Sequence, residues 1–280
     1  KGYINAKAPA GGLQGANILF PKVSVGATEN LLMAATLAKG TTVLSNAAKE
    51  PEITNLAECL IKMGAKISGH GTETITIEGV PALSGAHHRV LADRIETGTY
   101  AIAVAMTGGS VTLKNTTTEH LNAVMGYIAQ AGVDIDTAGE DVTFSRINSN
   151  PLYGVDIMTE PYPGFPTDMQ AQFMAMLSIC GGAGLVTETI FENRFMHVPE
   201  LVRMGADIVV QGNSAIVRGV PKLYGAEVMA TDLRASVALV LADLVAEGET
   251  IIEDAEELNE SFPGFVETLR GLGADLDFVE

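Results

Sequence analysis

One short phrase closes four helix-like segments along this chain. It reads IKMGAKI, IAQAGVDI, VRMGADI and RGLGADL, and its glycines lie about 70 residues apart, at Gly64, Gly132, Gly205 and Gly273. A strand-like phrase (LQGA, LSGA, LYGV and LYGA) and a phrase in which a helix leads into a strand (KGTTVL, GGSVTL, GAGLVTE and EGETII) keep the same spacing. Three phrases in register predict one structural unit used about four times, which limits the fold to packed copies of that unit.

The first copy predicts the order of elements within a unit. Helix and strand signals indicate, in chain order, a strand at 15–20, a helix at 24–40, a strand at 41–47, a helix at 50–65 and a hairpin at 65–80. The unit is therefore β-α-β-α-β-β, an α/β (α+β) design. A single unit cannot cover its own sheet and helix faces, so the copies are expected to pack around buried helices. Residues 99–106 and 236–246 are apolar nearly all round and are predicted to be such helices.

The two ends of the chain do not coincide with unit boundaries. KGYINAKA, at 1–8, is predicted to be the closing strand of one unit, whereas the last unit reaches DLDFVE, at 275–280, before its own closing strand. Because the two segments are complementary in the order of the unit, 1–8 is a candidate to pair behind 275–280.

Composition fits a protein with a large aliphatic core. The chain has 280 residues, of which 47% are hydrophobic and 5% aromatic, enough for one or two domains. No apolar run approaches the ~18 residues of a membrane span, and the first residues show no signal-peptide core. Two cysteines, Cys59 and Cys180, predict no disulfide framework and favour a reducing compartment, so the cytoplasm is the expected location.

The net charge of −17 argues against a nucleic-acid partner, because phosphodiester binding requires clustered Lys and Arg and the chain has only 17 of them. An anionic small molecule is compatible with this charge where a few cations gather locally. The start of the first helix in each unit is the expected place. These starts read PKVSVGAT, ADRIETGT, FPTDMQAQF and ATDLRAS.

A helix start presents unpaired N–H groups and the positive end of the helix dipole, and therefore attracts phosphate or carboxylate. Lys22, Ser24 and Gly26 make the first start a candidate phosphate cradle: a cation, a hydroxyl, and a glycine that lets the backbone approach an anion. The alternative is that Ser24 is a plain helix N-cap.

A second candidate set consists of Arg94, Asp168, Arg194, Asp232 and Arg234. Asp168 and Asp232 lie near the first position of their helices, where capping or dipole complementation is the alternative role. Arg234 lies in a helix that is otherwise almost wholly apolar. Its charge needs a partner, and Asp232 or an anionic ligand is the expected one.

Several of these motifs resemble one enzyme family closely. PKVSVGAT, AAKEPEI, DRIETGT, FPTDMQAQF, TETIFENRFMHVPEL and ATDLRAS resemble the UDP-N-acetylglucosamine 1-carboxyvinyltransferases, the enolpyruvyl transferases that begin bacterial peptidoglycan synthesis. The resemblance runs from about Gly2 to Gly248. It implies an inside-out α/β architecture of two domains, each made of three units, with helices inside and substrates in the cleft between the domains. Residues 1–92 would be the last unit of the first, catalytic domain, and 93–280 the second domain.

The resemblance also implies a reaction and a set of site residues. Enolpyruvyl would pass from phosphoenolpyruvate to the 3-hydroxyl of UDP-N-acetylglucosamine through a tetrahedral ketal, with release of phosphate and without a metal or organic cofactor. Asp168 would be the carboxylate beside the sugar hydroxyl. The remaining assignments are the nucleotide diphosphate for Lys22, Val23, Ser24 and Gly26, the nucleotide sugar for Ile190, the phosphoenolpyruvate side for Arg194, Asp232 and Arg234, and a substrate contact for Arg94.

The sequence also departs from this family. Complete members are longer at the N-terminus by about two units, which carry a Lys-Asn pair and a mobile loop with a reactive cysteine. Cys59 and Cys180 lie at helical packing positions instead and are predicted to be neither nucleophiles nor acids. An incomplete first domain would favour self-association.

The C-terminal segment departs as well. Where the family has an Arg-containing segment, this chain has the acidic Glu260 near the expected cation, and ESFPGF resembles the end of 5-enolpyruvylshikimate 3-phosphate synthases. Three alternatives therefore stand: an impaired transferase, a silent or engineered repeat scaffold that retains the fold, and the shikimate-pathway enzyme. The histidines show no metal-ligand spacing. His197 is predicted to be a packing residue, and His87 and His88 would point apart in a strand.

Overall fold

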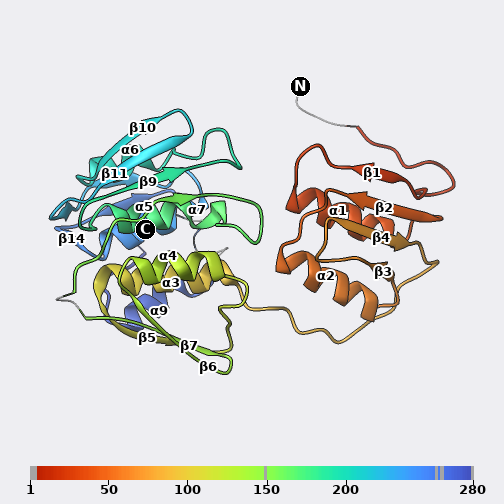
Figure 1. The fold of residues 1–280 in the computed structure, drawn as a ribbon, viewed down its shortest axis with the longest axis horizontal. Helices are drawn as coiled ribbons and strands as arrows, with labels where there is room; N and C mark the ends of the chain where they lie inside the picture. Colours follow the sequence, from red (N-terminus) through yellow and green to blue (C-terminus); the bar gives the residue numbers. More distant parts are fainter. Residues whose placement is uncertain (1–4, 148–149, 256–257, 259–261, 279–280) are drawn as a thin grey trace. The chain divides into compact units, whose positions relative to one another are not determined.

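The computed structural model describes residues 5–147, 150–255, 258 and 262–278, and these divide into two compact units (Figure 1). The first unit contains 5–91 together with the short segment 161–163, and the second contains the described residues of 92–160 and 164–278. Each unit has its own hydrophobic core. Both mix helices with short sheets, so the protein is a mixed α/β fold.

The first unit is one complete copy of the repeat. Its elements are β1 (Asn17–Leu19), α1 (Val25–Ala35), β2 (Thr41–Ser45), α2 (Pro51–Lys62), β3 (Lys66–Ser68) and β4 (Thr74–Glu78). The sheet order is β1-β2-β4-β3, with β1 parallel to β2 and the other pairs antiparallel. The predicted order β-α-β-α-β-β is confirmed for this copy. The first helix is shorter than the predicted 24–40, because the chain turns after Ala35 toward Gly40, whose φ is +90°.

The third copy of the repeat has the same topology and carries most of the candidate site. Its elements are β8 (Ile157–Met158), the 3-10 turn η1 (Thr167–Met169), α5 (Gln170–Leu177), β9 (Ala183–Thr187), α6 (Val198–Arg203), β10 (Asp207–Gln211) and β11 (Ser214–Arg218). The sheet order is β8-β9-β11-β10, and β8 and β9 run parallel. Both strands therefore end at the same edge of the sheet, just before the loops that hold Thr159 and Glu188.

The second and fourth copies are variations on this plan. The second comprises α3 (Arg94–Thr107), β5 (Gly109–Leu113), α4 (Asn122–Gln130), β6 (Asp134–Ala138) and β7 (Asp141–Arg146), with sheet order β5-β7-β6. The fourth comprises β12 (Leu223–Tyr224), β13 (Glu227–Met229), α7 (Leu233–Asp243), β14 (Ala246–Glu247), β15 (Ile251–Glu253) and α9 (Phe265–Gly271). Its strands form the parallel pairs β12–β14 and β13–β15.

Three helices form the centre of the second unit. Helix α5 packs against both α3 and α7, and every side chain of α5 is buried. Phe165 and Phe173 meet edge to face there, with ring centroids 4.8 Å apart. Both segments predicted to be central helices, 99–106 and 236–246, lie in α3 and α7 and are mostly buried, although α7 ends at Asp243. This confirms, for the copies in the second unit, that they pack around buried helices.

The recurring glycine phrase is the end of each second helix. Gly64, Gly132, Gly205 and Gly273 all have φ near +100°, a backbone conformation that glycine adopts without strain. In the first copy Ala65 N donates to Leu60 O at 2.9 Å, and the equivalent bond recurs in the other three. This bond satisfies a helix carbonyl beyond the last turn.

The strand-like phrase requires glycine for a different reason, which is close backbone approach. A Cβ on Gly15, Gly154 or Gly225 would lie within about 2.3 Å of a backbone oxygen of the neighbouring segment, whereas a Cβ on Gly85 would meet nothing within 4 Å. The LSGA copy, at 83–86, forms no strand, so that prediction was wrong. It lies in the connection between the two units, where no neighbouring strand runs beside it. His87 and His88 share this strandless connection, and His88 Nδ1 lies 3.2 Å from Lys62 Nζ.

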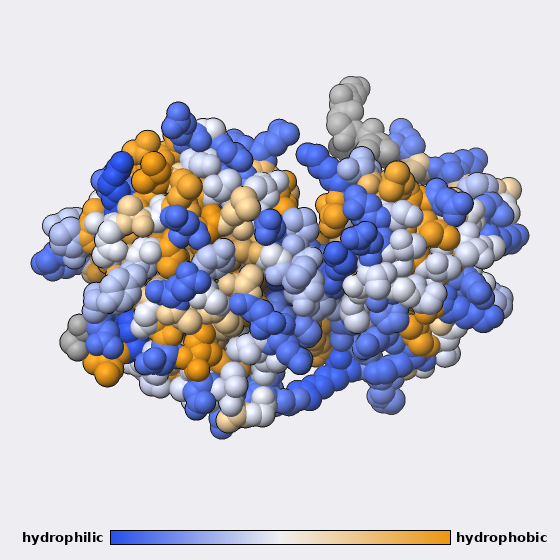
Figure 2. Space-filling view, in the orientation of Figure 1, coloured by the Kyte–Doolittle hydropathy of each residue, from blue (hydrophilic) through white to orange (hydrophobic). Residues whose placement is uncertain are grey.

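The N-terminal segment does not form the predicted closing strand within the described residues. Residues 5–8 and 275–278 have no strand pairing, so the proposed pairing of 1–8 with 275–280 is not observed there; 1–4 and 279–280 lie outside the described residues. Across the described parts of the chain, the model contains no helix with the length and apolar character of a membrane span. Figure 2 shows patches of apolar residues among polar ones on both units.

Candidate functional site

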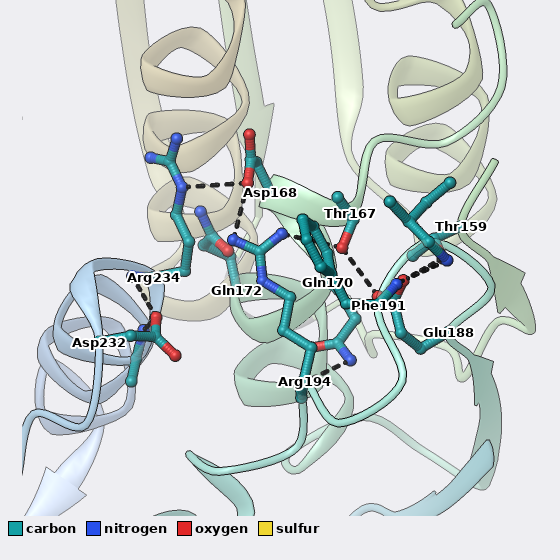
Figure 3. Close-up of polar contacts among 12 residues, drawn as sticks. Thr159, Thr167, Asp168, Gln170, Gln172, Glu188, Phe191, Arg194, Asp232 and Arg234 are labelled. Carbon is teal, nitrogen blue, oxygen red and sulfur yellow. Dashed lines mark hydrogen bonds and ion pairs between the residues drawn. The ribbon is translucent and has the colours of Figure 1, made fainter. Parts of the chain in front are cut away.

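Three of the predicted site residues converge in the second unit. Arg194 Nη2 lies 2.8 Å from Asp168 Oδ1, and Arg234 Nε lies 3.5 Å from the same oxygen (Figure 3). Asp168 lies in η1, Arg194 in the loop that precedes α6, and Arg234 in the first turn of α7. The central helices therefore bring together two cations and one carboxylate that are far apart in sequence.

Asp232 supports this cluster from the helix start. It is the N-cap of α7, and its Oδ1 accepts hydrogen bonds from the backbone N–H of Arg234 at 2.7 Å and of Ala235 at 3.0 Å. The sequence placed Asp232 near the first helical position, with capping as the alternative role, and the structure confirms the capping alternative. The sequence also named Asp232 or an anionic ligand as the partner of the Arg234 charge; in the structure the guanidinium pairs with Asp168 instead of Asp232. Asp168, by contrast, is no cap, because it lies in the middle of η1.

Aromatic rings lie beside both guanidinium groups. The Arg194 guanidinium carbon is 5.0 Å from the centroid of Phe191, and that of Arg234 is 5.6 Å from the centroid of Phe262. The side chains of Arg194 and Arg234 are only 21% and 18% exposed. Rings in these positions favour a cation electrostatically and restrict its rotamers.

The charge state of Asp168 reflects two opposed effects. Burial alone would raise the pKa of its carboxyl, but the positive charges of Arg234 and Arg194 and their hydrogen bonds outweigh it, so the pKa is lowered from 3.8. Asp168 is therefore an anion at neutral pH. Its pKa would rise if an anionic ligand paired with the two arginines, because the raising effect of burial would then be opposed less.

Glu188 anchors the cluster from behind, and sequence reasoning missed it. Its Oε2 accepts from Thr167 Oγ1 at 2.8 Å, and Thr167 Oγ1 in turn accepts from Arg194 Nη1 at 2.9 Å (Figure 3). Its Oε1 accepts from Thr159 Oγ1 at 2.8 Å. Glu188 is 2% exposed. Two features of the sequence could have pointed to this contact: the acidic Glu188 within TETIFENRF, and the hydroxyl of Thr167 next to Asp168 in FPTDMQAQF.

His197 lies close to the site and is buried, as predicted for a packing residue. Its Nε2 is 3.2 Å from Met174 Sδ. Burial lowers the pKa of its imidazole to about 4, with a smaller opposing effect from Asp232 and a lowering effect from Arg194. The ring is neutral at pH 7. Gln170, also buried, donates from Nε2 to Arg194 O at 3.2 Å and so fixes the backbone of that arginine.

The predicted phosphate cradle lies in the first unit, at the start of α1. Ser24 is the N-cap, and its Oγ accepts from Ala27 N at 3.3 Å, so the plain capping role is present. Lys22 is exposed and Val23 half-buried. Gly26 is also exposed, and a Cβ there would meet nothing within 4 Å. The chain itself therefore does not need a glycine at 26, and the helix start is open to a ligand.

The other predicted site residues occupy separate places. Arg94 is half-buried at the first position of α3, after the N-cap Asp93. Ile190 is half-buried in the loop after β9, and its backbone N–H donates to Glu188 Oε1 at 2.8 Å. Glu260, expected to face a cation position, lies outside the described residues.

The cysteines are consistent with packing roles. Cys180 is buried at the end of α5, and burial raises the pKa of its thiol to about 12. Cys59 is half-buried on α2. Within the described residues, no cluster of three or more His, Cys, Asp or Glu side chains is arranged to hold a metal ion.

Comparisons with known proteins identify the family to which the chain is similar. Residues 1–269 match the family model described as EPSP synthase (3-phosphoshikimate 1-carboxyvinyltransferase). The chain is 58% identical over 278 residues to the UDP-N-acetylglucosamine 1-carboxyvinyltransferase of Rhodospirillum centenum and 59% identical over 276 residues to that of Acidiphilium cryptum. Each alignment covers 99% of this chain but 64% and 65% of the relative, so the chain spans about two thirds of the length of these relatives.

Solved structures give the same grouping. The enolpyruvyl transferase NikO from Streptomyces tendae superimposes with a TM-score of 0.79 at 27% identity, covering 90% of this chain and 60% of that one. An EPSP synthase from Acinetobacter baumannii, at 20% identity and a TM-score of 0.69, shares the fold over 96% of this chain and 64% of its own. The chain belongs to the EPSP synthase family of 1-carboxyvinyltransferases.

Proposed function

We propose that this chain acts in the transfer of a 1-carboxyvinyl group from phosphoenolpyruvate to the 3-hydroxyl of UDP-N-acetylglucosamine. The observation that carries the proposal is the cluster of Asp168, Arg194 and Arg234, found in a chain 58–59% identical to relatives with that name. The cluster combines a carboxylate for proton transfer with two guanidinium groups for an anion.

The two arginines suit phosphoenolpyruvate, which carries a carboxylate and a phosphate. A guanidinium group presents N–H donors in a planar fork that matches both groups, and charge-assisted hydrogen bonds of this kind are roughly twice as strong as neutral ones. Asp232 and Gln170 hold Arg234 and Arg194 by their backbones, at 2.7 Å and 3.2 Å, so both side chains start from fixed positions. Asp232 therefore belongs to the site as a support of Arg234.

Asp168 would act as the base for the sugar hydroxyl. When the phosphoenolpyruvate anion pairs with Arg194 and Arg234, these arginines stabilise the Asp168 carboxylate less. Their lowering effect on the Asp168 pKa then weakens, and the raising effect of burial remains. Binding of the donor substrate thus makes Asp168 a better proton acceptor. The proton of the 3-hydroxyl passes to Asp168 as the hydroxyl oxygen bonds to C2 of phosphoenolpyruvate, while C3 takes up a proton from solvent and becomes a methyl group. Loss of phosphate from C2, together with one proton from that methyl group, then restores the vinyl group.

The nucleotide end of the acceptor would bind elsewhere. Lys22 and the open start of α1, with Val23, Ser24 and Gly26, suit a diphosphate. Ile190 offers an apolar contact for the nucleotide sugar, and Arg94 a further cation. The proposal includes the inside-out architecture, in which α3, α5 and α7 are the inner helices of the second domain and residues 1–92 the last unit of the first.

The same proposal places the protein in the cytoplasm, where peptidoglycan precursors are made, and so connects it to cell shape and division. No metal or organic cofactor takes part in the proposed reaction. Self-association through the first unit is also proposed, and the mass of the chain in solution tests it.

Calorimetric titration of the full chain with UDP-N-acetylglucosamine and then phosphoenolpyruvate tests the proposal, together with an assay of phosphate release. We expect Lys22→Ala to weaken nucleotide-sugar binding and Asp168→Asn to remove turnover. Glu58→Gln, an exposed change on α2, serves as the control that leaves both unchanged. If neither substrate binds, the chain is a silent scaffold, and the proposal is refuted.

A second candidate acceptor is shikimate 3-phosphate, because the matched family model is described as 3-phosphoshikimate 1-carboxyvinyltransferase and ESFPGF points the same way. Titration with shikimate 3-phosphate under the same conditions separates the two acceptors. The acceptor proposed above predicts no measurable heat in this experiment.

A further inference from the structure

Glu188 receives more hydrogen bonds than its role at a strand end requires. Oε1 accepts from Thr159 Oγ1 at 2.8 Å, Ile190 N at 2.8 Å and Phe191 N at 3.1 Å, while Oε2 accepts from Thr167 Oγ1 at 2.8 Å. Only a carboxylate accepts all of these without offering a donor of its own. Glu188 therefore fixes the loop of Ile190 with one oxygen and reaches toward the cluster with the other.

The direction of each hydrogen bond matters here. Thr167 has one hydroxyl proton and gives it to Glu188, so the lone pairs of its oxygen face Arg194 Nη1, 2.9 Å away. The other guanidinium nitrogen, Nη2, then meets Asp168 at 2.8 Å. Buried hydrogen bonds linked in this order strengthen one another.

We propose that Glu188 is a positioning residue of the site, which acts through the Thr167 hydroxyl to hold the Arg194 guanidinium against Asp168. Its significance for catalysis rests on the proposed function, because Arg194 and Asp168 are the groups assigned there to phosphoenolpyruvate and to the sugar hydroxyl. Glu188 itself contacts neither Arg194 nor Asp168 directly. The same carboxylate holds the 190–191 backbone, so it couples the nucleotide-sugar contact to the anion site.

The structure supplies a matched control for this relay. Thr159 and Thr167 both donate to Glu188 at 2.8 Å, and each accepts one further hydrogen bond. Thr159 accepts from the backbone N–H of Thr189, whereas Thr167 accepts from Arg194. Thr159→Val and Thr167→Val therefore each remove one hydrogen bond to Glu188, at Oε1 and at Oε2 respectively, but only Thr167→Val removes the link to the guanidinium.

The carboxyl carbon of Asp168 reports on the relay without any ligand. In protein labelled with ¹³C at aspartate, the Asp168 signal is identified by its loss in Asp168→Asn and followed through an acid titration. Among the residues that the structure describes, the charged groups that face Asp168 are Arg194 and Arg234. We expect Thr167→Val to shift the titration midpoint upward, since a less restrained Arg194 stabilises the anion less, while Thr159→Val and Thr167→Ser keep the wild-type midpoint.

Glu188→Gln tests the direction of the bond. The amide of glutamine would donate to the Thr167 oxygen at the point where Glu188 now accepts from it. The Thr167 proton then loses its acceptor, and the hydroxyl no longer keeps its present orientation toward Arg194. We expect the same upward shift as for Thr167→Val. An unchanged midpoint in Thr167→Val, or an equal shift in Thr159→Val, would overturn the proposal. If Glu188→Gln fails to fold, the two threonine variants and Thr167→Ser still decide.

Titration of phosphoenolpyruvate into the same variants separates this inference from the proposed function. Loss of one charge-assisted hydrogen bond is expected to weaken phosphoenolpyruvate binding about fivefold in Thr167→Val, with Thr159→Val unchanged. If the wild-type chain binds no phosphoenolpyruvate, the proposed function fails, and the carboxyl titration alone still tests the relay. If binding is normal but unaffected by Thr167→Val, the relay is refuted and the function stands.

Discussion

Arg146 closes the end of the central helix α3, and its replacement should be costly. Nε donates to Ala105 O at 2.6 Å and Nη2 to Met106 O at 3.3 Å, both in the last turn of α3, while Nη1 donates to Asn150 O at 2.7 Å. The residue is 9% exposed. Burial lowers the pKa of Arg146, yet a guanidinium remains charged in this setting. One cation therefore satisfies several buried carbonyls.

The magnitude follows from the two short hydrogen bonds. A hydrogen bond to a charged group contributes about 1.5–3 kcal/mol, and carbonyls left without a partner add a desolvation cost, so Arg146→Met should lose about 3–5 kcal/mol of unfolding free energy. For a unit of this size, that corresponds to a fall in Tm of about 6–20 °C. Arg146→Lys should fall between, because an ammonium lacks the planar fork.

Arg218→Met is the matched control. Arg218 lies at the end of β11 and pairs with Asp207 at 3.4 Å, but both side chains are about half exposed. An exposed ion pair of this kind contributes about 0.2–1 kcal/mol. Differential scanning calorimetry of the three variants at neutral pH compares them directly. If Arg146→Met lowers Tm no more than Arg218→Met does, the guanidinium does not hold the end of α3.

Three further outcomes are expected. Gly154→Ala should sharply reduce soluble, folded protein, since a Cβ would lie 2.3 Å from a backbone oxygen, whereas Gly85→Ala should leave Tm nearly unchanged; both are read by thermal melting. His197 is neutral in the folded chain down to about pH 4 but takes up a proton below pH 6.5 when unfolded, so stability should fall as pH drops from 6.5 to 4, and His197→Gln should flatten that slope in urea titrations. Iodoacetamide at pH 8 should modify Cys59 much faster than Cys180 in the native protein, because the thiol of Cys180 is buried with a pKa of about 12; intact-protein and peptide mass spectrometry show which site reacts first.

Much of the fold was predictable, because the repeat places residues with one clear structural role at regular spacing. Gly64 and its counterparts end helices in a conformation that other residues rarely adopt, so they are recognisable in the sequence. Gly85 keeps the same spacing without the same environment, and this is why LSGA was taken for a strand. Local sequence records the phrase but not whether a neighbouring strand lies beside it.

The candidate site was predictable as a set of residues but not as a set of contacts. Motifs identified Asp168, Arg194 and Arg234, which the structure brings together, yet the protein side chain expected to pair with Arg234 was Asp232 rather than Asp168. A helix start offers Asp232 two competing uses, as a backbone cap and as a counter-ion, and only the packing of α5 against α7 places Asp168 within reach. Glu188 was missed because its hydrogen bonds join β8, β9 and η1, whose proximity depends on strand pairing.

The two carboxylate oxygens of Asp168 have different surroundings and can therefore have different roles. Both arginines contact Oδ1, and among the described residues no ion pair or hydrogen bond engages Oδ2 (Figure 3). A proton can therefore arrive at Oδ2 and leave it again while Oδ1 keeps the plane of the group fixed. In the proposed reaction Asp168 would therefore accept and release the proton without turning its side chain, and an asparagine would preserve the anchor at Oδ1 while losing the oxygen that exchanges the proton.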